Sequence, residues 1–322
     1  MLGPLIVCYL FLGGAGAGAC FVLAVLGLLA PRELVTVEEV HAASSRTVLR
    51  VPEAYRHLLF PGYAVALVVL VVGMTCLVGD IGRIDRLMLL LTNPTVSFVA
   101  VGAWSLVICL VMAVLLAAVW SGILRRWRWR AVCVLQVALA LVAVTVMVYT
   151  GLLLQSLSAV PLWATPWLPV LFVLSSLSCG VALVLVTAQF TDSGRTFATT
   201  FGCVAAADAF VVILEAIVAA VFVATALAGI GGDFIEGRTA EALAASAQAL
   251  VAGESAWLFW GGFVAVGLVV PFVLDLVLVR LRRSCPQVAL VAAACVLVGG
   301  FLLRFCVVEA GMRPLLAFAA IG

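Results

Sequence analysis

Long apolar runs separated by short polar connectors dominate the pattern of this chain. Eight segments each hold the roughly 20 apolar residues that a membrane-spanning helix needs. Lipid offers the backbone no hydrogen-bond partners, so such segments must satisfy their own polar groups as helices. The pattern therefore predicts an all-α integral membrane protein with eight transmembrane helices, at residues 4–29, 60–79, 97–120, 131–156, 168–189, 203–229, 257–279 and 288–308.

We expect one membrane domain over residues 1–322, with two four-helix bundles, formed by the first four and the last four helices, as a reasonable architecture. The first segment lacks the basic start and the short length of a signal peptide, which favours a spanning helix. Connector 30–59 contains four Glu, four Arg and both His, and predicts an amphipathic helix plus a loop. Connector 230–256 predicts an Ala-rich helix from Thr239, lying on the membrane surface or under a partner.

Composition agrees with a membrane protein and excludes several other classes. Of the 322 residues, 66% are hydrophobic and only 10% are charged, too few charges for a soluble domain to cover so much apolar surface. The sequence contains no Lys, and its Arg residues are spread over connectors without a stripe that could bind nucleic acid. The motifs GxSxG, HExxH and the Walker loop are absent from the sequence. We therefore predict no catalytic residue within this protein.

The arginines predict the orientation in the membrane. With eight spans, the connectors after odd-numbered helices share one face, and that face would be cytoplasmic with both termini outside. Trp120 fits an aromatic belt on the cytoplasmic side, and Trp163, Trp167, Trp257 and Trp260 fit an outer belt. The face predicted to be cytoplasmic carries twelve arginines: Arg32, Arg46, Arg50, Arg56, Arg125, Arg126, Arg128, Arg130, Arg195, Arg280, Arg282 and Arg283.

Cysteine and histidine positions argue against a redox metal in this protein. The ten cysteines lie mostly in apolar runs and no pair has CxxC spacing, so we expect neither an iron–sulfur cluster nor a zinc site. His41 and His57 both lie in the first connector, outside any predicted span. A haem held between membrane helices takes its axial His ligands from the spans, so we also expect no haem.

A cluster of polar and aromatic residues closes the fourth predicted helix. Tyr149, Thr150 and Gln155 lie just inside the predicted outer surface, before a proline-rich turn over 161–169. Lipid alone does not call for these groups, and they suggest a pocket for a partly polar, partly apolar molecule such as a quinone. Thr150 could instead bond its own backbone, and Gln155 could simply be interfacial.

Two other helices bring candidate residues to the same outer depth. Tyr9 offers a phenol, and Gly13 and Gly14 leave room either for close helix packing or for a flat ligand ring. Trp104, about two turns into the third helix, is either a packing residue or a pocket wall. We predict a quinone site, for menaquinone or a relative, made of Tyr9, Gly13, Gly14, Trp104, Tyr149, Thr150 and Gln155.

Four ionisable residues lie within predicted spans, where charge is costly and often functional. Asp208 and Glu215 are seven residues apart, on one helix face about 10 Å from each other. With Asp275 and Arg304 they could form a proton relay, or they could serve only interhelical hydrogen bonds. A proton-coupled secondary transporter that uses Asp208, Glu215 and Arg304 is the alternative function.

Several stretches resemble the NrfD/polysulfide reductase family of membrane subunits. The more specific ones run from Tyr149-Thr-Gly to Leu168-Pro-Val-Leu-Phe and over Leu297-Val-Gly-Gly-Phe-Leu-Leu-Arg304. The glycine-rich first helix, Asn93-Pro-Thr with Gly102-Ala-Trp104, and Trp260-Gly-Gly-Phe extend the likeness over most of the sequence.

The resemblance implies a haem-free, quinone-reactive anchor of a respiratory complex in a prokaryotic cytoplasmic (inner) membrane. It implies a quinone site near the outer face, a four-cluster ferredoxin-like iron–sulfur subunit as partner and, beyond it, a molybdopterin catalytic subunit. We expect quinol oxidation, with electrons passing to the iron–sulfur subunit; quinone reduction, with electrons in the reverse direction, is the alternative. Tyr149 matches the tyrosine of the family's Tyr-Thr-Gly motif, and Asp208 and Glu215 resemble acidic family positions. Tyr9 stands where some relatives carry a polar ring such as His. A tyrosine titrates at about 10 whereas a histidine titrates at about 6.5, so Tyr9 is less suited to accept a proton.

Overall fold

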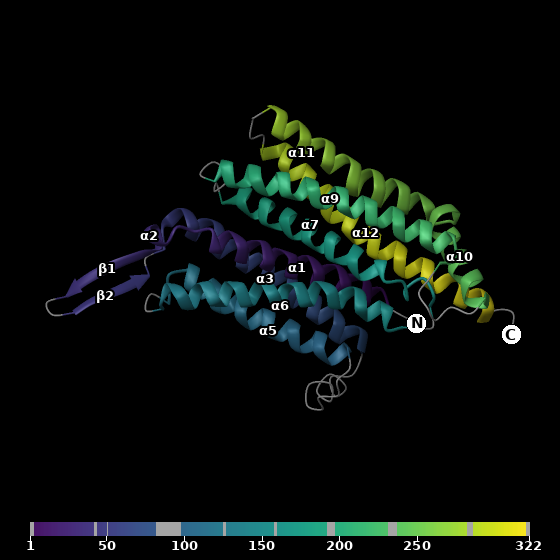
Figure 1. Ribbon diagram of the computed structural model, residues 1–322, viewed down its shortest axis with the longest axis horizontal. Coiled ribbons are helices and arrows are strands. Elements are labelled where there is room, and N and C mark those ends of the chain that lie inside the picture. Colours follow the sequence, from purple (N-terminus) through teal and green to yellow (C-terminus); the bar gives the residue numbers. More distant parts are fainter. Residues whose placement is uncertain are drawn as a thin grey trace.

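Long helices packed side by side form most of the molecule, as the computed structural model in Figure 1 shows. The structure describes residues 3–41, 44–49, 51–81, 98–124, 127–157, 160–191, 197–230, 237–281 and 286–319. Within them, seven helices are long and apolar enough to cross a membrane. They are α1 (Pro4–Leu28), α3 (Glu53–Ile81), α5 (Phe98–Trp120), α6 (Trp129–Gln155), α7 (Trp167–Phe190), α9 (Ala198–Leu227) and α12 (Pro286–Ala319). The protein is therefore a multi-pass membrane protein.

The predicted segment 257–279 is helical but not uniform. It begins as a π-helix, η1 (Leu258–Val269), and continues as α11 (Val270–Leu281). Its described apolar part, Leu258–Leu274, is shorter than the seven spans. The helix type changes beside Pro271, which has no N–H to donate to the preceding turn.

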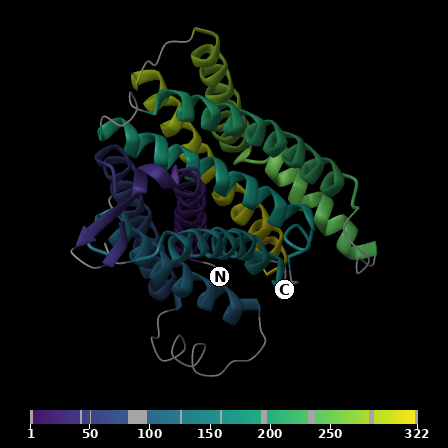
Figure 2. The ribbon, with the colours of Figure 1, turned by 60° about the vertical axis from the view of Figure 1, so that its left-hand side comes forward.

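The helices fall into two groups that meet along α1. In Figure 1, α1, α3, α5 and α6 form one group, and α7, α9, α11 and α12 form the other. Figure 2 shows α1, in purple, enclosed between the two groups, where it contacts α3, α6 and α7. The start of α1 and the end of α12 lie at one end of the molecule, which we name the terminal end. The opposite end, which carries a β-hairpin, is the hairpin end.

The hairpin corrects the expectation for connector 30–59. Instead of an amphipathic helix, this segment forms a four-residue helix, α2 (Arg32–Val35), and then strands β1 (Thr36–His41) and β2 (Ser44–Leu49). The strands pair antiparallel, with Thr36 opposite Leu49 and His41 opposite Ser44. The β-branched Thr36, Val37 and Val40 favour an extended backbone over a helix. In connector 230–256 the structure does form a helix, α10 (Gly237–Ala252), which packs on α12 and α9.

Glycines allow several of the helices to approach closely. A Cβ added to Gly18 of α1 would meet the backbone of Ser176 in α7, and one on Gly180 would meet the backbone of Gly18. The same relation holds between Gly267 of η1 and Gly299 of α12. Small residues at these crossings bring the helix backbones into contact, which is a main source of helix association in lipid.

Two tryptophans do not lie where the aromatic belts would place them. Trp120 and Trp163 are both buried inside the helix bundle, and the Nε1 of Trp163 donates to the carbonyl oxygen of Val307 at 3.0 Å. Trp167 and Trp257 are exposed at the terminal end, which agrees with a belt. The buried pair (Trp120 and Trp163) and the exposed pair (Trp167 and Trp257) all lie near helix ends. What differs between the pairs is whether the side chain points into the bundle or out of it.

The contact between Gly18 and Gly180 makes a stability prediction. Gly180→Ala should destabilise the fold by about 1–3 kcal/mol, because its methyl group would overlap the backbone of α1. Gly202→Ala is the matched control, since a Cβ there has open space and Ala favours the helix by about 1 kcal/mol. The measurement is the fraction of detergent-solubilised protein that stays monodisperse after graded heating. Equal heat sensitivity of the two variants would contradict the proposed packing.

Candidate quinone site and buried arginine

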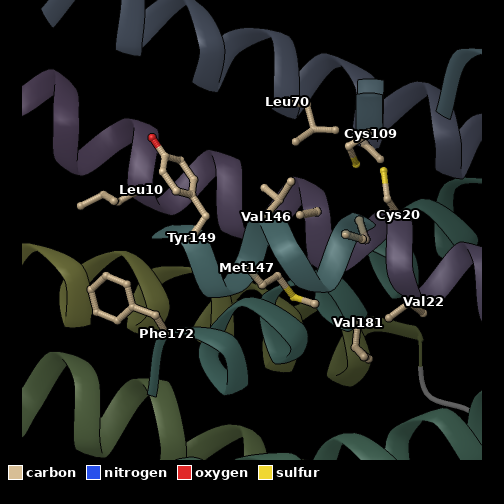
Figure 3. Packing of buried hydrophobic residues seen from close by; sticks show 14 of the residues in the cluster. Leu10, Cys20, Val22, Leu70, Cys109, Val146, Met147, Tyr149, Phe172 and Val181 are labelled. Atoms are coloured by element: carbon tan, nitrogen blue, oxygen red, sulfur yellow. The ribbon is translucent and has the colours of Figure 1, made fainter. Parts of the chain in front are cut away.

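Two tyrosines from distant parts of the sequence meet at the terminal end of the first helix group. Tyr9 lies near the start of α1 and Tyr149 near the end of α6, and their hydroxyls hydrogen-bond to each other. Tyr9 is 1% exposed and Tyr149 is 5% exposed. Figure 3 shows Tyr149 with its hydroxyl directed toward α1, and the apolar side chain of Val146 beside it. The structure thus brings together the two phenols that the sequence placed at one depth.

Each tyrosine ring lies on a glycine. The ring of Tyr9 covers Gly13 of its own helix, where an added Cβ would lie 3.4 Å from Cε2. The ring of Tyr149 lies directly against Gly102 of α5, where any Cβ would overlap it. Gly102 was not among the predicted site residues. The sequence does place Gly102 two residues before the predicted site residue Trp104. Residues two apart on a helix lie on different faces, so Gly102 can face the tyrosine ring while Trp104 does not.

The other predicted quinone residues lie apart from this pair or have partners of their own. Thr150 is buried and its hydroxyl donates to the carbonyl oxygen of Met147 at 2.7 Å, so it satisfies itself within α6. Gln155 is the last residue of α6 and is partly exposed. Trp104 is 45% exposed on the outside of α5, which places it away from the ring of Tyr149. Asn93 to Thr95, part of the resemblance, lie outside the described residues.

Arg304 is fully buried at the junction between the two helix groups. Its Nε donates to the carbonyl oxygen of Leu10 in α1 at 3.1 Å. Nη1 donates to Ser175 Oγ at 3.2 Å and to the carbonyl oxygen of Gly300 at 2.7 Å. Nη2 donates to Ser176 Oγ at 2.7 Å. The guanidinium therefore joins α1, α7 and α12 through hydrogen bonds made by all three of its nitrogens.

Aromatic rings and a carboxyl group complete the surroundings of the guanidinium. Its carbon lies 5.2 Å from the ring centre of Phe172 and 5.8 Å from that of Phe11, within the range of cation–π attraction. Ser175 also hydrogen-bonds to Glu215 of α9, so one hydroxyl links Arg304 to that carboxyl group. Sequence reasoning missed both serines, because a hydroxyl within an apolar run gives no sign of its partner.

Gly14 belongs to this arginine site rather than to the tyrosine pair. A Cβ on Gly14 would meet Ser176 Oγ and lie 3.0 Å from Nη2 of Arg304. The missing side chain thus makes space for a protein group. Gly13 and Gly14 are neighbours in α1 and serve two different sites.

Of the remaining ionisable candidates, the structure describes the side chains of Asp208 and Glu215 but not that of Asp275. Asp208 and Glu215 of α9 are both buried. Asp275 lies on α11, and its side chain lies outside the described part of the structure. Among the described residues there is no group of His, Cys, Asp and Glu suited to hold a metal ion.

The helical architecture and these buried polar groups define a multi-pass membrane protein with a polar site inside its bundle. Residues 1–315 match the family described as "Polysulphide reductase, NrfD". Because the match extends over nearly the whole sequence, the protein belongs to this family, and the resemblance drawn from the sequence is confirmed.

Two curated relatives are similar to part of the protein. The C subunit of polysulfide reductase from Wolinella succinogenes is 31% identical over 177 residues, which span 55% of this protein and 53% of that relative. Protein NrfD of Escherichia coli is 34% identical over 178 residues, which span 55% of this protein and 52% of that relative. The match thus extends over about half the length of these relatives.

Arg304 makes a second prediction. Arg304→Lys should lower stability by about 2–3 kcal/mol, because an ammonium group cannot reproduce the planar set of donors and leaves buried acceptors without partners. Arg128→Lys at the exposed start of α6 is the control and should have almost no effect. Thermal unfolding of both variants in the same detergent tests this. A midpoint for Arg304→Lys equal to that of the control would show that the four hydrogen bonds contribute nothing.

Proposed function

We propose that this protein is the quinone-reactive membrane anchor of a respiratory oxidoreductase complex. Its site would be the Tyr9–Tyr149 pair at the terminal end. The observation that carries the proposal is this pair of buried, mutually hydrogen-bonded phenols within spanning helices. Membership of the NrfD family supports it, because a quinone and electron-transport role fits that family.

The chemistry of the pair suits the head group of a quinone. Each carbonyl oxygen of a quinone accepts a hydrogen bond, and a phenol in apolar surroundings is a donor of matching size. Helix α1 is apolar around Tyr9, which suits an isoprenoid tail. No carboxylate or lysine is needed to hold a neutral ring. Tyr9 and Tyr149 therefore supply the polar contacts that such a molecule requires.

Binding must change the pair, because the structure holds it closed. The two hydroxyls satisfy each other, and the rings already fill the space beside Gly13 and Gly102. A bound quinone ring would break the hydrogen bond between Tyr9 and Tyr149. One of the two phenols would then donate its hydrogen bond to a carbonyl oxygen of the quinone. The lost tyrosine–tyrosine bond is replaced by a tyrosine–quinone bond, so the exchange is close to neutral in energy.

Quinol oxidation would deliver two electrons and two protons at this site. Among the described residues no metal-binding group is present to carry the electrons onward, so we place the next carrier in a separate subunit. That partner would be a four-cluster ferredoxin-like iron–sulfur protein at the terminal end, followed by a molybdopterin catalytic subunit. The Wolinella relative is named as one subunit of polysulfide reductase, which supports membership of such a multi-subunit enzyme.

The number of spanning helices decides on which side of the membrane the terminal end lies. We propose that η1 and α11 together form an eighth span, so that both termini face outward and the hairpin end faces the cytoplasm of a prokaryotic cell. The arginine-rich connectors then lie inside, as the positive-inside rule requires. Arg304 supports an anchor rather than a transporter, because its hydrogen bonds tie it to the protein frame.

The tyrosine pair makes a third prediction. In the assembled complex, Tyr149→Phe should lower quinol oxidation about tenfold, because it removes a hydrogen bond to the reacting ring worth about 1.4 kcal/mol. The phenyl ring still covers Gly102, so folding should be preserved. Trp104→Phe on the exposed side of α5 is the matched control and should leave turnover within about twofold. Unchanged turnover in Tyr149→Phe would remove this residue from the mechanism.

Isolation of the complex makes a fourth prediction. The protein, purified from its native membrane in a mild detergent, should retain a stoichiometric subunit with iron–sulfur absorption and paramagnetic signals. Those signals should appear when quinol is added to an oxidised sample. A protein that purifies alone, and that transports a solute when reconstituted, would point to the transporter instead.

A further inference from the structure

Three helices of the first group enclose a second polar site, at the hairpin end. Gln136 lies two turns into α6, Trp120 ends α5, and Gly27 lies near the end of α1. A Cβ on Gly27 would meet Nε2 of Gln136 and lie 3.2 Å from Cζ2 of Trp120. The missing side chain of Gly27 therefore allows the amide and the indole to lie together against one stretch of helix.

The polar atoms of this site have no partner within the described protein. Gln136 and Trp120 are both fully buried. Neither Nε2 nor Oε1 of Gln136, nor Nε1 of Trp120, has a hydrogen-bond partner among the described residues. Leaving a buried donor or acceptor unpaired costs about 1–3 kcal/mol for each group. Three such atoms in one place require a ligand that both donates and accepts.

A third buried side chain extends this site toward the middle of the bundle. Tyr63 of α3 is fully buried, and its hydroxyl also has no partner among the residues described. It lies near the thiols of Cys20 and Cys109, which hydrogen-bond to each other. Cys20 precedes Gly27 by seven residues, a rise of about 10 Å along α1. Unpaired polar atoms thus recur along one side of α1.

We propose that ordered water binds Gln136, Trp120 and Tyr63, so that the hairpin-end half of the first helix group is hydrated. Water fits because the indole needs an acceptor, the amide needs both a donor and an acceptor, and the phenol uses either. Gln136, Trp120 and Tyr63 carry no charge that would favour a metal ion or an anion. The inference is independent of the proposed quinone function.

The hydrated region ends before the tyrosine pair. Figure 3 shows Cys20 and Cys109 facing each other, with Leu70 and Val146 between them and Tyr149. Leu70 and Val146 are fully buried and apolar, so water has no polar partner there. The proposed water therefore stops inside the bundle, without joining the two faces of the membrane.

Radiolytic footprinting of the protein in lipid nanodiscs tests for this bound water. A brief X-ray pulse makes hydroxyl radicals from water, and mass spectrometry reads the oxidised residues. Trp120 should be oxidised within about threefold of exposed Trp257, although Trp120 is 0% exposed. Trp163 is the matched control, equally buried but with its Nε1 bonded to Val307, and should react at least about tenfold more slowly. Oxidation of Trp120 as slow as that of Trp163 would overturn the proposal.

Replacement of the amide gives a second, independent test. Gln136→Met keeps the length of the side chain and removes its polar atoms. If water is bound, oxidation of Trp120 should fall severalfold and the thermal midpoint should drop. If the site is dry, the variant should be more stable than the native protein, because an unpaired amide has been removed, and this result would overturn the proposal. Gln155→Met, at the partly exposed end of α6, should change neither measurement.

Discussion

The arrangement of the helices depends on a fully buried guanidinium. Arg304 carries a charge into a lipid-embedded bundle, where an unpaired donor is costly, so groups from three helices must converge on it. That requirement fixes α1 against α7 and α12, and it is met only because Gly14 leaves space for Ser176 and Nη2. Once α1 is fixed in this way, the position of Tyr9, one residue before the carbonyl of Leu10, is fixed as well.

The tyrosine pair and the arginine are therefore neighbours in one structure rather than two separate features. Leu10 accepts a hydrogen bond from Arg304, while Tyr9 beside it bonds to Tyr149. A displacement of α1 would disturb both. This supports a structural explanation for most of the intramembrane polar residues, with Ser175 and Glu215 extending the same network into α9. The residues left to contact a quinone are the two phenols and the glycines beneath them.

Sequence patterns predicted the elements well where one local property decides the structure. Segments of about 20 apolar residues became spanning helices because lipid leaves the backbone no other partner. Connector 30–59 shows the limit, since its charges suggested an amphipathic helix whereas its β-branched residues form a hairpin. Trp120 and Trp163 show it again, because nearness to a helix end does not tell whether a ring faces lipid or the core. Trp104 shows the same limit, because counting residues gave its place along α5 but not that its side chain is 45% exposed.

By itself, the sequence determined that the protein spans a membrane as a helical bundle and how far along its helix each polar residue lies, since both follow from counting residues along a helix. Only the tertiary structure decided which of those residues meet. Arg304 and Leu10 are 294 positions apart, and no periodicity within α12 or α1 links them. The rotation of each helix about its axis is set by its neighbours. Side-chain partners, and with them the composition of the site, therefore come from packing.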